Sequence, residues 1–156
     1  MDFETLGNIG DFLGGIGVII TLIYLTSQIR QNTKSIRVSA FQTAQRDVAQ
    51  FMDQLASDPD LVRLFFEGGR SFPNLDQRDR QRYATLMVSL CKRIETIVHE
   101  LNAGNIDPSQ CEGILEHCRV TLEQPGAKLW WEEAKHLFNR ELRDHVSAHR
   151  PLSDDA

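Results

Sequence analysis

Acidic residues and a histidine lie close together in the middle of the chain, at Glu95, His99 and Glu100. Glu95 and His99 are four positions apart, so on a helix they share one face, where a carboxylate and an imidazole can bind a metal ion. Helical di-metal sites instead use Glu-x-x-His pairs and further inward carboxylates, and neither feature is present. We therefore predict no metal site and expect Glu95 to pair with Lys92, Arg93 or a neighbouring helix.

The three cysteines, Cys91, Cys111 and Cys118, are odd in number and form no CxxC pair, so neither a disulfide framework nor a zinc knuckle is indicated. Cys118 follows Glu116 and His117 directly, but consecutive residues point to different faces of a helix. A Cys-His nucleophile pair is therefore not indicated. We expect Cys118 to be a small core residue.

Other catalytic and nucleic-acid motifs are also missing. No GxGxxG or GxxxxGK[ST] phosphate-binding loop occurs. The basic run of Arg78, Arg80 and Arg82 is interrupted by Asp79, which is typical of a solvated helix start. The formal charge of −5 gives no general attraction to nucleic acid. The sequence predicts no enzymatic activity, no cofactor and no nucleic-acid partner.

Two adjacent tryptophans, Trp130 and Trp131, are the most conspicuous aromatic feature. Neighbouring residues differ by about 100° around a helix, so the two rings face different ways. Trp130 aligns with Ala127, Ala134 and Leu137, which predicts a core position. Trp131 aligns with Phe138 and is expected to cover a helix junction or to contact a partner protein.

A stretch without charge lies near the start of the chain. All 17 basic residues lie at or after Arg30, and residues 12–29 carry no charge at all. Eighteen helical residues extend about 27 Å, close to the roughly 30 Å of a bilayer core. We predict a transmembrane helix. A signal peptide is disfavoured because no basic residues precede the segment, and a buried helix of a soluble protein is the other alternative.

The charges that flank this segment predict its orientation. Arg30, Lys34, Arg37 and Arg46 follow it before the next acid, Asp47, whereas no basic residue precedes it. The positive-inside rule therefore places the N-terminus outside and the rest of the chain in the cytoplasm.

Small residues recur in phase along the same helix, at Gly7, Gly10, Gly14, Gly17 and Thr21. Steps of three and four place them on one face, where small side chains let membrane helices approach closely. We predict self-association through this face. The alternative is that glycine is simply common in membrane helices.

Polar Gln28, Gln31 and Asn32 fall where the helix would meet water. Solvation at the interface is the ordinary explanation, and the lining of a pore in an oligomer is the alternative.

The rest of the chain has helical periodicity and no alternation typical of strands. No Gly or Pro occurs from Val18 through Asp58, so the membrane helix is expected to continue as a stalk, with a break near Asn32 as the alternative. Asp58 and Asp76 are predicted helix caps, and Asp107-Pro108 is expected to begin another helix. Gly68-Gly69 is expected to end the helix that Asp58 begins, and residues 127–138 are expected to form a fifth helix. The predicted fold is all-α: a transmembrane helix, a stalk and a small cytoplasmic helical bundle. The predicted divisions are residues 1–29 (N-terminal segment and membrane helix), 30–150 (helical cytoplasmic domain) and 151–156 (flexible tail).

Three strings of residues resemble a known group. They are residues 25–33 (LTSQIRQNT), residues 58–61 (DPDL) and the Trp130-Trp131 pair. The order of these strings is similar to that in short bacterial proteins of unknown function with one N-terminal membrane helix and a helical cytoplasmic domain. The resemblance implies a bacterial inner-membrane location and transfers no activity.

Together these features predict a single-pass membrane protein that self-associates and acts as a scaffold or interaction module. Its expected partners are the lipid bilayer, other copies of the chain, and a membrane or cytoplasmic protein. A small oligomeric channel is the first alternative. A membrane-tethered metal-dependent enzyme that uses Glu95 and His99 is the second.

Overall fold

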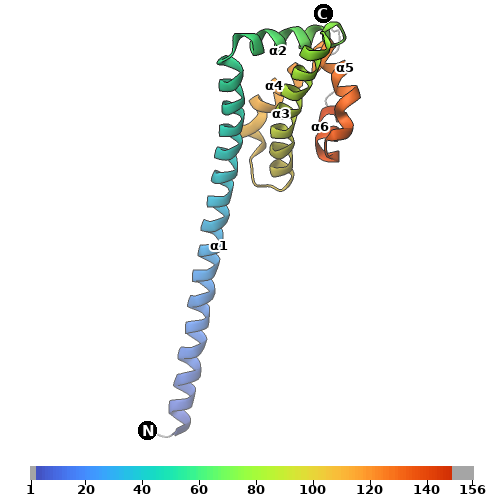
Figure 1. Ribbon diagram of the computed structural model, residues 1–156. Coiled ribbons are helices and arrows are strands. Elements are labelled where there is room, and N and C mark those ends of the chain that lie inside the picture. Colours follow the sequence, from blue (N-terminus) through green and yellow to red (C-terminus); the bar gives the residue numbers. More distant parts are fainter. Residues whose placement is uncertain (1–2, 149–156) are drawn as a thin grey trace, which may run out of the picture. The chain divides into compact units, whose positions relative to one another are not determined.

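The computed structural model describes the backbone of residues 3–148 and the side chains of residues 12–148. The described chain is all-helical and contains no strand, which confirms the predicted fold class. Figure 1 shows the elements in chain order. They are α1 (Phe3–Ala56), α2 (Pro59–Ser71), the 3₁₀ turn η1 (Phe72–Asn74), α3 (Gln77–Asn102), α4 (Pro108–Glu123), α5 (Pro125–Ala134), the 3₁₀ turn η2 (Lys135–Leu137) and α6 (Arg140–Ala148).

Helix α1 is continuous through Asn32, so the alternative of a break at that point is wrong. The absence of Gly and Pro between Val18 and Asp58 leaves nothing in the sequence to interrupt its backbone hydrogen bonds. The chain divides into two compact units, residues 1–38 and residues 39–156. The last part of α1 therefore belongs to the second unit, whereas its earlier part forms the first. The predicted tail, residues 151–156, lies outside the described residues.

Aspartates begin three helices of the second unit, as the sequence predicts. The Asp58 carboxylate accepts hydrogen bonds from the backbone N–H groups of Asp60 and Leu61 at the start of α2. Asp76 and Asp107 accept equivalent bonds at the starts of α3 and α4. Each cap satisfies donors that a helix start would otherwise leave without a partner. Gly104, with φ of +71°, follows the end of α3.

Two glycines expected to end the second helix instead lie inside it. Helix α2 continues through Gly68 and Gly69 to Ser71. A Cβ atom at Gly68 would collide with the ring of Tyr83, and one at Gly126 of α5 would collide with the Gly68 carbonyl oxygen. These glycines are therefore needed for the close approach of α2, α3 and α5 rather than for a helix stop. The fifth helix also ends earlier than predicted, at Ala134, and η2 follows it.

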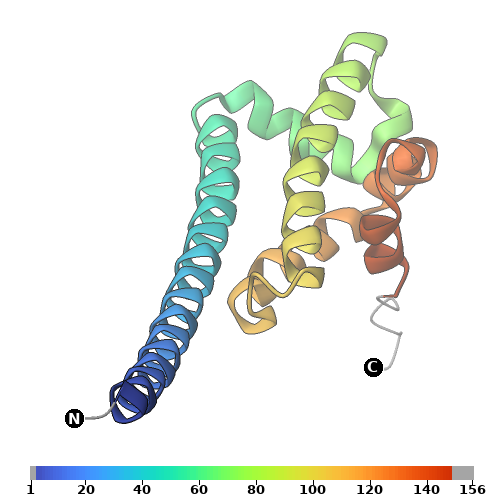
Figure 2. The same ribbon diagram turned by 90° about the horizontal axis from the view of Figure 1, so that it is seen from below.

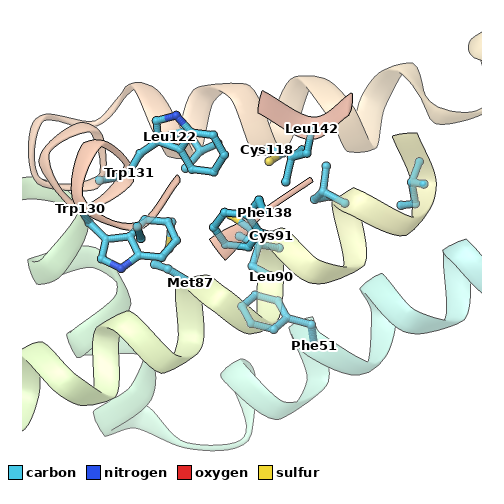
Figure 3. Packing of buried hydrophobic residues seen from close by; sticks show 14 of the residues in the cluster. Phe51, Met87, Leu90, Cys91, Cys118, Leu122, Trp130, Trp131, Phe138 and Leu142 are labelled. Carbon is cyan, nitrogen blue, oxygen red and sulfur yellow. The ribbon is translucent and has the colours of Figure 1, made fainter. Parts of the chain in front are cut away.

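Helix α3 is central to the bundle, in contact with α2, α4 and α6 (Figure 2). Its buried face carries Tyr83, Met87, Leu90 and Ile94, none more than 2% exposed. Trp130 of α5 is 1% exposed, which confirms its predicted core position. The cluster also includes Phe51, from the part of α1 that belongs to this unit, and Figure 3 shows how these side chains pack. The second unit thus has one shared hydrophobic core.

Candidate functional site

The side chains of residues 12–29, in the first unit, are exposed, including Phe12 at 69% and Ile23 at 65%. Among the described residues, one helix is long and apolar enough to cross a membrane, and it is α1.

The glycine face of this segment is equally open. A Cβ atom added at Gly14 or Gly17 would meet nothing within 4 Å. The side-chain surroundings of Gly7 and Gly10 lie outside the described residues. Thr21 donates its hydroxyl hydrogen bond to the Gly17 carbonyl oxygen at 2.8 Å. The side chains on this face are thus small, and the Thr21 hydroxyl is already bonded within its own helix. The face has room for another helix.

The polar residues at the end of the segment are all exposed. Gln28 donates a hydrogen bond to the hydroxyl of Tyr24 at 2.7 Å, whereas Gln31 and Asn32 face solvent. Arg30 and Lys34 are also exposed and make no ion pair within the described residues. The end of the apolar segment is therefore surrounded by polar and basic groups.

Glu95 and His99, the two residues considered for a metal site, make contacts between helices. Glu95 accepts hydrogen bonds from Lys92, as the sequence predicts, and from the backbone N–H of Asn139. Burial raises the pKa of Glu95, but these two hydrogen bonds outweigh that effect, so its pKa lies below the ordinary value. His99 contacts the Glu141 carboxylate at 3.2 Å. Glu95 and His99 thus tie α3 to the start of α6. No three His, Cys, Asp or Glu side chains come together as metal ligands among residues 12–148.

The three thiols are buried, as expected for Cys118. Burial raises the pKa of Cys118 to about 12. Burial also raises the pKa of Cys91, with Cys118 and Glu95 as smaller contributors in the same direction. A nucleophilic thiolate needs a shift in the opposite direction. The environment of these thiols is that of core residues.

Trp131 stacks on Phe138 with a ring separation of 5.3 Å and an interplanar angle of 16°. Trp130 contacts the same ring edge-on at 6.2 Å. The ammonium group of Lys92 lies 5.1 Å from the centre of the Phe138 ring. Trp131 therefore covers the junction between α5 and η2 and is only 7% exposed, and the edge it leaves open lines a groove.

This groove lies in the second unit and has a volume of about 900 Å³. It exists because α4 packs on α3 and α5, and α6 packs on α3, while α4 and α6 scarcely touch each other. Residues at intervals of three and four along α4 line it from one end of that helix to the other. Its apolar surface comes from Ile94, Leu115, Leu122, Trp131, Leu142 and Val146, some of which are labelled in Figure 3.

The edges of the groove are charged. Glu112, Glu116 and Glu123 follow one edge along α4, and Arg119 pairs with the last two of them. Lys128 and Glu132 lie on α5, and His145 lies on α6. Three of the four carboxylates in the lining have basic partners: Arg119 pairs with Glu116 and Glu123, and Lys135, outside the lining, pairs with Glu132. Glu112 makes no ion pair among the described residues.

No pattern in the sequence marks this groove. Cys111, Leu115, Cys118 and Leu122 fall within roughly 60° of one another around α4, which is an ordinary apolar stripe. Whether a neighbouring helix covers that stripe completely depends on the path of α6. That path is a tertiary property.

No protein-family model, no curated protein and no solved structure matches this chain. The resemblance to short bacterial membrane proteins therefore stays a prediction from the residues that carry it.

Proposed function

We propose that this chain is a single-pass protein of the bacterial inner membrane that self-associates through its glycine face and presents its helical bundle to the cytoplasm as a scaffold or interaction module. The observation that carries the proposal is the uncovered apolar segment, residues 12–29. Exposed apolar surface of this extent is costly in water and favourable in a bilayer.

The polar groups within the segment support the same proposal. Thr21 and Thr26 donate their hydroxyl hydrogen bonds to carbonyl oxygens one turn earlier, and Gln28 bonds to Tyr24. A polar side chain whose donor is already bonded inside its own helix is less costly to place in hydrocarbon. Arg30 and Lys34 then mark the end that stays in the cytoplasm.

Fractionation of cells that express the full chain tests membrane insertion and topology. We expect the chain to stay in the membrane pellet after alkaline carbonate extraction. A reporter that works only in the cytoplasm should be active when it is fused to the C-terminus, and a reporter that works only in the periplasm should be inactive there. Recovery of the chain in the soluble fraction would contradict the proposal, and a periplasmic C-terminus would contradict its orientation.

Gly14 and Gly15 provide a matched pair for self-association. Both positions are open, but only Gly14 belongs to the glycine face. In mild detergent, Gly14→Leu should shift the oligomer towards monomer, whereas Gly15→Leu should leave it unchanged because its side chain points elsewhere. A monomeric wild-type chain, or equal effects of the two substitutions, would contradict self-association through this face.

A further inference from the structure

We propose that the groove between α4 and α6 is a docking site for a basic amphipathic helix of a partner protein. The inference rests on the proposed role of the bundle as an interaction module, and it names the class of partner that the bundle takes.

The shape of the groove fits a helix. Side chains of α3, α4, α5 and α6 line it, and α4 and α6 scarcely touch each other. A further helix laid between α4 and α6 would contact side chains of both, as in helix-in-groove recognition. The lining runs from Pro108 to Glu123 along α4, which is about 22 Å and matches a helix of roughly four turns.

The apolar interior of the groove fits one face of such a helix. Leu115 of α4 and Val146 of α6 both line the groove, and each is half-buried. Trp131 of α5 also contributes to the lining. An apolar stripe at positions i, i+3, i+4 and i+7 of the partner would cover these side chains and remove them from water.

The charge of the groove edges favours a positively charged partner helix. Glu112 and Glu116 follow the α4 edge, and Glu112 makes no ion pair within residues 12–148. When Lys135, which pairs with Glu132 from outside the lining, is counted with Arg119 and Lys128, four carboxylates stand against three basic groups and leave an acidic excess of one charge. A partner helix with Lys or Arg beside its apolar stripe complements this excess, and an acidic helix is repelled by it.

The chain's own residues 149–156 are a competing occupant, since they follow α6 directly. They carry Asp154 and Asp155 against one Arg, Arg150, with His149 counted as neutral. Their apolar content is small and their net charge has the wrong sign for an acidic edge. A variant that ends at Ala148 tests this occupant directly.

The test uses the full chain in nanodiscs of zwitterionic lipid and a synthetic helical peptide of about 14 residues, which extends about 21 Å. The peptide has Leu at i, i+3, i+4 and i+7, Lys at the flanking positions, and a photo-crosslinking group in its apolar stripe. A second peptide replaces every Lys by Glu, and a third has the Lys composition in scrambled order. We expect cross-links from the first peptide alone, mapped by mass spectrometry to α4 and α6.

Matched substitutions then test the position of the site. Leu115→Asp should reduce cross-linking more than about tenfold, because it places a charge in the apolar contact. Val120→Asp, on the same helix but outside the groove, should not reduce it. Glu112→Lys should weaken binding about three- to tenfold at low salt, whereas Glu133→Lys, with the same change in net charge outside the groove, should not. Because Glu112 is exposed, its substitution separates lost binding from lost folding.

Equal cross-linking of the Lys and Glu peptides, cross-links outside the groove, or absence of cross-links would overturn the inference. So would cross-linking that occurs only in the chain ending at Ala148, since the groove would then belong to residues 149–156. These outcomes leave the fractionation result unchanged. A chain that fails to pellet with membranes would instead contradict the proposed function while the groove still binds the basic peptide.

Discussion

The two units of the chain use the same kinds of residue for opposite purposes. Ile23, in the first unit, is 65% exposed, whereas Ile94, in the second, is 2% exposed. Gly14 has open space around its Cα atom, whereas Gly126 touches the backbone of α2. In the second unit, apolar residues and glycines such as Ile94 and Gly126 pack against other parts of the same unit. The described side chains of residues 12–29 in the first unit are exposed instead, as the proposed membrane helix requires.

The strongest test of this contrast is the same substitution in both units. Ile94→Ala should destabilise the bundle by about 2–5 kcal/mol, because it leaves a cavity among fully buried side chains. Ile23→Ala should leave the bundle's stability unchanged, since no described residue packs on Ile23. Urea unfolding in mild detergent, followed by tryptophan fluorescence of Trp130 and Trp131, measures both. Equal loss of stability in the two variants would show that the first unit is packed against protein after all.

Glycine substitutions sharpen the contrast at a smaller magnitude. Gly126→Ala should cost about 1–3 kcal/mol, because the new methyl group collides with backbone atoms of Gly68, Ser71 and Phe72, which cannot rotate away. Gly113→Ala, in an open position of α4, should instead stabilise the bundle by about 0.5–1 kcal/mol. Thermal unfolding monitored by circular dichroism separates the two. A neutral Gly126→Ala would mean that α2 and α5 are further apart than described.

Local signals in the sequence predicted most of the fold. The helix starts at Asp58, Asp76 and Asp107 are short-range features, and each was confirmed by a hydrogen bond to its aspartate. Gly68 was predicted to end a helix. Its missing side chain instead makes room for the ring of Tyr83, a residue that lies next to it only in the folded chain. Local patterns thus predict where helices begin better than why two of them touch.

The candidate sites divide in the same way. The apolar segment could be predicted from the sequence because its uncharged, apolar composition belongs to one helix and does not depend on how helices pack. The groove could not, because it depends on the distance between α4 and α6, which no pattern in either helix specifies. Lys92 was one of three partners expected for Glu95, beside Arg93 and a neighbouring helix, but the Asn139 contact needed the fold.

Polar side chains offer a third comparison, with an effect of about 1 kcal/mol. Asp58→Ala removes the cap of α2 and should destabilise the bundle by about that amount. Thr21→Ala removes a hydroxyl bonded only within its own helix and should leave bundle stability unchanged. Denaturant midpoints of the two variants, measured side by side, check this. A destabilising Thr21→Ala would indicate that the first unit contributes to the fold of the second.

The smallest expected effect is a dependence on pH, and it too separates the units. No carboxylate lies between Phe12 and Val38, so acid cannot act on that part of α1 through such a group. In the second unit, the pKa of Glu95 lies below its ordinary value of 4.5 because Lys92 and the Asn139 backbone stabilise its charged form. A lowered pKa means that this stabilisation is complete above the ordinary value and is lost as the pH falls through the folded-state pKa. The wild-type chain should therefore exceed Glu95→Gln in stability by up to about 1 kcal/mol near neutral pH, and the difference should vanish in acid. A difference that persists unchanged in acid would mean that Glu95 acts through shape rather than charge.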